Sequence, residues 1–332
     1  MKFDRLLLVS ALALACTGQS AHAAEKISFG TNWVAQPEHG GFYQAVADGT
    51  YAACGIDVTI QPGGPQVNNR ALLLAGKIDF HMGGNLLEAF DAVAENIPLK
   101  VVAAVFQKEP QVLMSHPGQG LDSWEALKNA DQYILGDAGY LTFFQWMKNE
   151  FGFDDAKRVP YTFNPAAFIA NLKSVQQGYV TSEPFAVERE GGFKPNLFLI
   201  ADYGFNTYST TIEAMQKTLD TKPEAVKCFV EGSIKGWYNY LYGDNAAANA
   251  LIQKDNPDMS DEQIAFSIEK LKEFGIVDSG DTETLGIGAM TDEHIASFYD
   301  KMVKAGVSRP GIDIKQAYTL DYVGKGVGLD LK

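Results

Sequence analysis

Apolar and polar positions follow two alternating spacings along the first third of the chain. Short apolar or alternating runs, as expected for strands, occur at 27–30, 56–60, 78–82 and 99–106. Helical spacing covers 41–53, 68–75 and 86–94, and Gly55 ends the first of these helices. This alternation of strand and helix predicts a parallel sheet with helices on both faces.

A second series of the same kind begins after residues 116–118. Strands are expected at 133–136, 159–162, 179–180 and 197–201, and helices at 123–130, 140–151 and 168–174. From residue 207 the pattern is helical, with helices expected at about 222–243, 245–255, 260–274 and 290–305. The pattern predicts an α/β protein with two units and a helical tail. Because the tail follows the second unit along the chain, we assign it to that unit.

The N-terminus has the pattern of a cleavable export signal. Lys2 and Arg5 precede an apolar run at 6–15, and small residues flank one variable position at 21–23. We expect residues 1–23 to form a signal peptide cleaved after Ala23. The apolar run is shorter than the roughly 20 residues that span a bilayer, so the mature chain is expected to be soluble. Lipid attachment at Cys16 is the alternative, but Ala13 stands where a leucine is usual.

The composition and net charge indicate which kinds of binding partner are unfavourable. The 332 residues carry a net charge of −14 at pH 7, which disfavours nucleic acid and anionic membranes. The length after cleavage suits two compact domains or one large one. An oxidising compartment permits a disulfide between Cys54 and Cys228, although we favour two separate buried thiols.

Motifs of catalysis and metal binding are absent. His39, His81, His116 and His294 show no metal-type spacing, and the chain has neither a nucleophile elbow nor a phosphate-binding loop. The glycine-rich segment 324–328 precedes no predicted helix and is interpreted as a C-terminal loop. The sequence therefore predicts a protein that is not an enzyme and needs no cofactor or metal.

Three glycine-containing loops follow predicted strands. They lie at 32–41, which includes Trp33, at 83–85 and at 136–140. Such loops bring backbone N–H groups and helix N-termini close to a ligand, although tight packing alone explains any single one of them. If two α/β units face each other, the loops meet in the cleft between them.

A fourth candidate segment, 178–184, ends a predicted strand and opens a helix. There Glu183 could accept hydrogen bonds from an amine or a ring N–H of a ligand, with Tyr179 beside it. The alternative is an ordinary acidic residue in the first turn of a helix. Trp33 by itself is more often a core or surface aromatic than a ligand contact.

At these positions the sequence resembles a known family. Segments 31–33 (TNW), 38–43 (EHGGFY), 55–58 (GIDV) and 62–65 (PGGP) are similar to the thiamine-pyrimidine-precursor-binding branch of the nitrate/sulfonate/taurine periplasmic binding proteins. Segments 75–80 and 182–184 fit the wider group. The resemblance covers most of the mature chain and implies a periplasmic substrate-binding protein of an ABC importer.

The resemblance also implies an architecture and a site. It implies the α/β type II periplasmic binding protein fold, which has two lobes and binds its ligand in the cleft between them. Lobe I is discontinuous and comprises 24–114 plus 207–332, so it includes the helical tail. Lobe II comprises 115–206. Trp33 would stack on a flat pyrimidine and Glu183 would bind its amine groups. The expected ligand-binding residues are Trp33, His39, Asn85, Tyr140, Asn164, Tyr179 and Glu183.

Partners and alternatives follow from the same resemblance. We expect a small-molecule ligand, an ABC transporter permease in the inner membrane, no nucleic acid and a monomeric chain. A sulfonate or nitrate ligand is the first alternative, but the nearest basic residues to the candidate loops are Arg70 and Lys108. The second is a pyridoxal-phosphate-dependent pyrimidine synthase, whose lysine and histidine are missing from loop 83–89.

Overall fold

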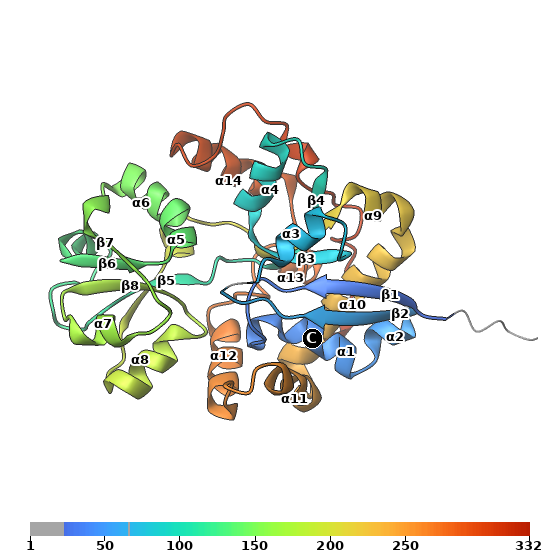
Figure 1. The fold of residues 1–332 in the computed structure, drawn as a ribbon, viewed down its shortest axis with the longest axis horizontal. Helices are drawn as coiled ribbons and strands as arrows, with labels where there is room; N and C mark the ends of the chain where they lie inside the picture. The colour runs from blue at the N-terminus through green and yellow to red at the C-terminus, as the bar shows by residue number, and fades with distance from the viewer. Residues whose placement is uncertain (1–22, 66) are drawn as a thin grey trace, which may run out of the picture.

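Two five-stranded sheets organise the chain in the computed structural model, which describes residues 23–65 and 67–332 (Figure 1). The predicted signal peptide therefore lies almost entirely outside the described residues. Each sheet has its own helices, and the two sheets lie apart in the ribbon, with the second sheet in green on the left. Among the described residues, no helix combines the length and apolar character that a membrane crossing requires.

The first sheet has the strand order β2-β1-β3-β10-β4. Its strands are β1 (Glu25–Gly30), β2 (Ile56–Gln61), β3 (Phe80–Asn85), β4 (Leu99–Phe106) and β10 (Ser209–Met215). Strands β1, β2 and β3 pair in parallel, whereas β10 is antiparallel to both β3 and β4. Strand β10, which lies between β3 and β4, therefore comes from a distant part of the chain.

Helices from both ends of the chain surround the first sheet. They are the 3-10 turn η1 (Pro37–His39), α1 (Gly40–Ala47), α2 (Thr50–Ala53), α3 (Asn69–Leu74), α4 (Leu86–Ala94), α9 (Gln216–Thr221), α10 (Pro223–Tyr242), α11 (Ala246–Asp255), α12 (Asp261–Glu273), α13 (Thr282–Leu285), α14 (Asp292–Lys304), η5 (Ile314–Gln316) and η6 (Leu329–Leu331). Helix α10 packs on α1, so the helical tail joins the first sheet. Its residues at this contact are aromatic: a Cβ on Gly40 would lie 2.0 Å from the Tyr240 ring, and one on Gly41 2.2 Å from the Trp237 ring.

The second sheet has the order β7-β6-β8-β5-β9. Its strands are β5 (Gln111–Ser115), β6 (Gln132–Leu135), β7 (Arg158–Pro160), β8 (Ser174–Tyr179) and β9 (Asn196–Leu199), with helices η2 (Glu125–Asn129), α5 (Asp137–Leu141), α6 (Phe143–Phe151), η3 (Asp155–Lys157), α7 (Ala166–Ala170), α8 (Glu183–Gly191) and η4 (Ile200–Tyr203). Strand β5 is antiparallel to β8 and β9. The second sheet thus uses one continuous stretch of chain, starting four residues before the predicted lobe boundary at 114/115.

Several sequence predictions need correction. Strands β5 and β10 were not predicted, and each makes its sheet mixed rather than parallel. The helix predicted over 41–53 is divided at Gly49, where φ is +76°, and the one predicted over 140–151 is divided at Thr142. The strand predicted at 179–180 occupies Ser174–Tyr179 instead.

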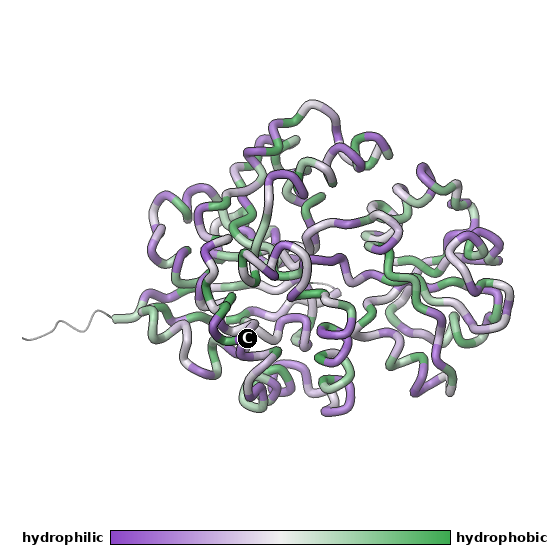
Figure 2. Tube along the Cα trace, turned by 180° about the vertical axis from the view of Figure 1, so that it is seen from behind, coloured by the Kyte–Doolittle hydropathy of each residue, from purple (hydrophilic) through white to green (hydrophobic). Residues whose placement is uncertain are grey.

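Buried hydrophobic side chains from both sheets and their helices form the core. In the Cα trace of Figure 2, hydrophobic positions follow the inner strands and hydrophilic positions are frequent on the outer loops and helices. An aromatic cluster at the centre stacks Phe80 on Phe229, with ring centroids 4.3 Å apart. Cys54 and Cys228 form a disulfide, so the preference for two separate thiols was wrong. The bridge joins the end of α2 to α10, two segments that are distant in sequence and adjacent in the fold.

Candidate functional site

A cavity of about 350 Å³ opens between the two sheets, within the size range of small-molecule sites. Both sheets contribute to its wall, mostly through loops at the carboxyl ends of parallel strands, where ligands of α/β proteins bind. The lining residues are Asn32, Trp33, Gln36, Glu38, Met82, Gln111, Gly136, Asp137, Ala138, Gly139, Phe163, Gln177, Gly178, Tyr179, Ser182, Glu183 and Thr210.

The loop after β1 supplies a polar and aromatic part of the wall. Asn32, Trp33, Gln36 and Glu38 line the cavity, but the following glycines do not. Those glycines instead allow α1 to approach α10 closely. The glycine pair in this loop is therefore explained by close packing of the two helices. This is the alternative to ligand contact that the sequence left open.

In the second sheet, the glycine loop after β6 does line the cavity. Residues 136–139 form part of the wall at the start of α5. The backbone N–H of Gly136 donates to Oε1 of Gln177 at 2.8 Å. A Cβ on Gly139 would lie 2.5 Å from that same oxygen, so only glycine leaves room for this amide. The loop therefore lies at the cavity wall, but the N–H of Gly136 is bound to Gln177, and contact of this loop with a ligand stays a prediction.

Two aromatic side chains meet across the cavity. The ring centroids of Trp33 and Phe163 lie 4.9 Å apart, with their planes tilted by 46°. Trp33 follows β1 of the first sheet, whereas Phe163 follows β7 of the second sheet. The pair therefore joins the two halves of the cavity wall.

Backbone strain also concentrates at this wall. Phe163 has φ of +59° and Thr210 has φ of +47°, in the left-handed region that residues with a Cβ rarely adopt. Both line the cavity, and among the described residues other than glycine only Asn96 also has a positive φ. Strain of this kind is retained where the surrounding structure holds a residue in position, often at a functional site.

Two buried carboxyl groups face the cavity. Burial raises the pKa of Glu38 to about 7, although a hydrogen bond from the Thr181 hydroxyl opposes the shift. Burial also raises the pKa of Glu183, whose Oε2 accepts the backbone N–H of Tyr179 at 2.7 Å. Both groups are held in place and can accept hydrogen bonds from a ligand.

Positive charge is missing from this wall. None of the lining residues is lysine, arginine or histidine, whereas Glu38, Asp137 and Glu183 are acidic. Arg70 lies instead beside Glu213, with 3.3 Å between Nε and Oε2. Lys108 lines a second cavity. The electrostatic environment of the main cavity therefore favours a neutral or cationic ligand that donates hydrogen bonds.

The predicted ligand-binding residues separate into two groups. Trp33, Tyr179 and Glu183 line the cavity together. His39 is buried beside it in η1, where burial lowers the pKa of its imidazole to about 3. Asn85 caps α4 by accepting the Leu87 N–H at 3.0 Å.

The last two predicted residues lie in the second half of the molecule, outside the lining. Tyr140 lies under the guanidinium of Arg158, 4.5 Å from its ring centroid, and Asn164 is exposed and accepts the Ala166 N–H at 2.8 Å. The structure therefore does not bring His39, Asn85, Tyr140 and Asn164 to the cavity wall, and their ligand contacts stay predictions.

Other residues of the wall were not predicted from the sequence. Glu38 stood inside a recognised loop, and its acidic side chain directly after Pro37 was the available signal. Gln111 and Thr210 were missed together with β5 and β10, because the strands that carry them were not predicted. Phe163 follows a short strand, and no local pattern marks it as a cavity residue.

Relatives and solved structures resemble this chain. The profile of the family described as NMT1/THI5 like matches residues 36–247, more than half of the chain. The riboflavin-binding protein RibY from Chloroflexus aurantiacus is 23% identical over 313 residues, which are 91% of this chain and 87% of RibY.

Among solved structures, the periplasmic aliphatic sulphonate-binding protein SsuA from Escherichia coli matches with a TM-score of 0.63 at 14% identity, over 88% of this chain and 91% of SsuA. The desulfurization enzyme DSZB matches with a TM-score of 0.57 at 11% identity, over 90% of this chain and 97% of its own. At such identities these similarities show the fold alone. The protein has the predicted two-lobed periplasmic binding protein architecture, and its chain belongs to the NMT1/THI5-like family.

Proposed function

We propose that this protein is the periplasmic solute-binding component of an ABC importer and carries a small aromatic nitrogen heterocycle, with the pyrimidine precursor of thiamine as the first candidate. The observation that carries the proposal is the composition of the cavity wall. It combines aromatic rings from both sheets with buried carboxyl groups and no cationic side chain. An aminopyrimidine offers a flat ring and N–H donors, which fit these two features.

The aromatic pair would hold the ring. Trp33 and Phe163 lie on opposite sides of the cavity, so a flat ligand can insert between them after the two rings separate. Stacking of a nucleobase-like ring on an aromatic side chain contributes roughly 1–3 kcal/mol. The aromatic pair would thus provide affinity for flat rings as a class.

The carboxyl groups would supply the selectivity. Glu38 and Glu183 can accept hydrogen bonds from the amino group or a protonated ring nitrogen, and the amide of Gln177 can donate or accept. A site built to pair with N–H donors rejects a ligand without them, because buried carboxylates are then left unpaired. Ligand analogues without the amine should bind much more weakly.

Contacts around Thr181 would link ligand binding to lobe closure. The Thr181 hydroxyl donates to Glu38, and its carbonyl oxygen accepts from Ser267 Oγ at 2.7 Å and from Gln263 Nε2 at 3.3 Å. These bonds join α12 and η1, beside the first sheet, to the start of α8 beside the second (Figure 1). A ligand held by Glu38 would therefore favour the closed arrangement that a permease recognises.

The alternatives fit the wall less well. A sulfonate or nitrate would meet no cationic side chain among the lining residues, because Arg158 lies outside the lining and is paired with Asp137. An enzyme with a Schiff base or a thiol nucleophile would need a lysine or cysteine, and neither is present among the lining residues. Riboflavin is the second candidate, because RibY is similar along almost the whole chain and riboflavin also has a flat ring with an N–H donor.

Isothermal titration calorimetry of protein freed of retained ligand by unfolding and refolding would test the proposal. Separate titrations would use the aminopyrimidine precursor, riboflavin, an alkanesulfonate and nitrate. We expect binding of the aminopyrimidine with one site per chain. Binding of the sulfonate or nitrate alone would refute the heterocycle proposal, and binding of riboflavin alone would select the second candidate.

A variant pair would localise the site. Trp33→Ala should lower the affinity by roughly 1–3 kcal/mol, because it removes one stacking surface. Leu172→Ala serves as the control, since Leu172 is 51% exposed and does not line the cavity. Equal affinities in the two variants would exclude Trp33 from the binding site.

A further inference from the structure

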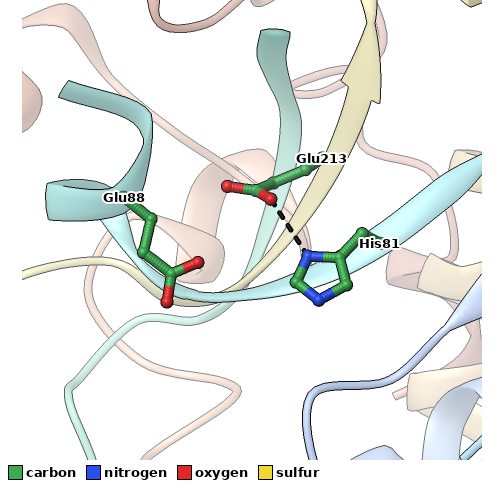
Figure 3. Close-up of side chains that lie close together, drawn as sticks. All are labelled: His81, Glu88 and Glu213. Atoms are coloured by element: carbon green, nitrogen blue, oxygen red, sulfur yellow. Dashed lines mark hydrogen bonds and ion pairs between the residues drawn. The ribbon is translucent and has the colours of Figure 1, made fainter. Parts of the chain in front are cut away.

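A second cluster of ligand-type side chains lies beside the first sheet and outside the main cavity. His81 on β3 and Glu213 on β10 are direct neighbours in the strand register, and Glu88 projects from α4 (Figure 3). One imidazole nitrogen and one oxygen from each carboxylate lie within 4.8 Å of one another. Met82 and Thr210 of the same two strands line the cavity, whereas none of these three residues does.

The hydrogen bonds of Glu213 are unevenly distributed. Its side chain has no exposed area, and its Oε2 lies 3.0 Å from His81 Nδ1 and 3.3 Å from Arg70 Nε. Its Oε1 is buried and receives no hydrogen bond from any residue that the structure describes. A buried carboxylate oxygen without a donor is costly, so this atom points to a missing electropositive partner.

Arg70 is shared between the two carboxylates, so one positive charge faces two acidic groups. Its Nε lies 3.5 Å from Glu88 Oε2, and its terminal nitrogen donates to the Glu88 backbone carbonyl at 2.8 Å instead. Oε2 of Glu88 is also buried and has no hydrogen-bond donor within the described part of the chain.

Two glycines leave space at these oxygens. A Cβ on Gly83 would lie 2.5 Å from Thr211 Oγ1 and 2.9 Å from Glu213 Oε1. A Cβ on Gly84 would lie 3.0 Å from Glu88 Oε1. The Gly83-Gly84 pair therefore keeps side-chain atoms away from the carboxylates. These glycines lie in β3 and not in the predicted loop, and they do not line the main cavity.

We propose that His81, Glu88 and Glu213 form a binding site for a divalent transition-metal ion such as Zn²⁺. One imidazole nitrogen and two carboxylate oxygens are ligands that zinc accepts, at about 2.0–2.2 Å. Oxygen-seeking Ca²⁺ is disfavoured, because it takes six to eight oxygen ligands. Small side-chain movements would bring the three atoms to bonding distance of one ion.

Metal binding would rearrange one proton. His81 Nδ1 lies 3.0 Å from Glu213 Oε2, a geometry in which Nδ1 can donate a hydrogen to the carboxylate. To bind the ion, Nδ1 must become unprotonated while Nε2 takes the hydrogen. Arg70 can retain its bond to Glu213 and act as a positioning residue for that carboxylate. The ion would connect α4 to β3 and β10 and stabilise the first sheet.

The test uses tag-free, full-length mature protein treated with a chelator. Titration calorimetry with ZnCl₂ should show one ion per chain, and saturation should raise the melting temperature. Glu88→Gln should weaken zinc binding by more than about tenfold, since it removes a direct ligand. This variant should fold, because Glu88 is 40% exposed and its loss relieves repulsion with Glu213.

Control variants separate this site from adventitious zinc. Glu95→Gln changes a surface carboxylate paired with Arg309, and His294→Asn removes a histidine paired with Asp281; both should bind zinc like the parent. Absence of zinc binding by the parent protein overturns the proposal. So does zinc binding that Glu88→Gln leaves unchanged.

Discussion

The buried carboxyl group of Glu38 should make the protein less stable as the pH rises, and Glu38→Gln should remove that effect. Glu38 is 2% exposed, and burial raises its pKa from 4.5 to about 7. Between these two values the folded state binds a proton that the unfolded state has lost. Stability from this group is therefore complete below about pH 4.5, decreases as the pH rises to about 7 and is constant above.

The structure also sets the size of the effect. A shift from 4.5 to about 7 corresponds to roughly 3 kcal/mol, at about 1.4 kcal/mol for each pKa unit. Glutamine keeps the shape of the side chain and an oxygen that can accept the Thr181 hydroxyl. The variant should therefore match the parent near pH 4.5 and exceed its unfolding free energy by about 3 kcal/mol at pH 8.

Urea unfolding at pH 4.5, 6, 7 and 8 measures this difference. Glu109 is equally buried and has a pKa raised to about 7, so its contribution to the pH dependence remains in both proteins. Glu95→Gln at the surface is the control and should follow the parent at every pH. If Glu38→Gln keeps the pH dependence of the parent, Glu38 is already ionised at neutral pH and the argument from burial is wrong.

Three further predictions concern the disulfide, helix packing and the ligand. Replacing Cys54 and Cys228 together by alanine should lower the unfolding free energy by about 2–5 kcal/mol in urea titrations; an unchanged midpoint would contradict this. Gly41→Ala should cost at least about 1–3 kcal/mol and lower the melting temperature, because its Cβ would overlap the Trp237 ring; a parental melting temperature would show that α1 and α10 can move apart. Glu183→Gln should weaken aminopyrimidine binding by about 1.5–3 kcal/mol in calorimetry, and full affinity would remove Glu183 from the site.

The helices of the C-terminal half were predictable because their apolar faces are regular. The helix expected over 222–243 is α10 (Pro223–Tyr242), and that expected over 260–274 is α12 (Asp261–Glu273). Strand β10 escaped prediction for the opposite reason. Its residues Ser209, Thr211 and Glu213 are polar yet buried, so the usual alternation of apolar and exposed polar positions is absent.

The candidate site was predictable only where local sequence carries the chemistry. Trp33, Tyr179 and Glu183 stand in loops next to predicted strands, and all three line the cavity. Phe163 and Thr210 line it because of the way distant segments meet, which no spacing within the sequence records. The glycines at 40–41 were expected to face a ligand but instead allow two helices to pack closely. Local sequence cannot distinguish these two roles of a glycine.

The position of β10 between β3 and β4 affects the order in which the chain can acquire its structure. The second sheet needs only residues 111–199, so it can form as soon as that stretch is available. The first sheet stays in two parts, β2-β1-β3 and β4, until Ser209–Met215 arrives to join them. In a chain that emerges from its N-terminus, the edge of β3 therefore stays unpaired until β10 has been made, and the second sheet can form before the first is complete.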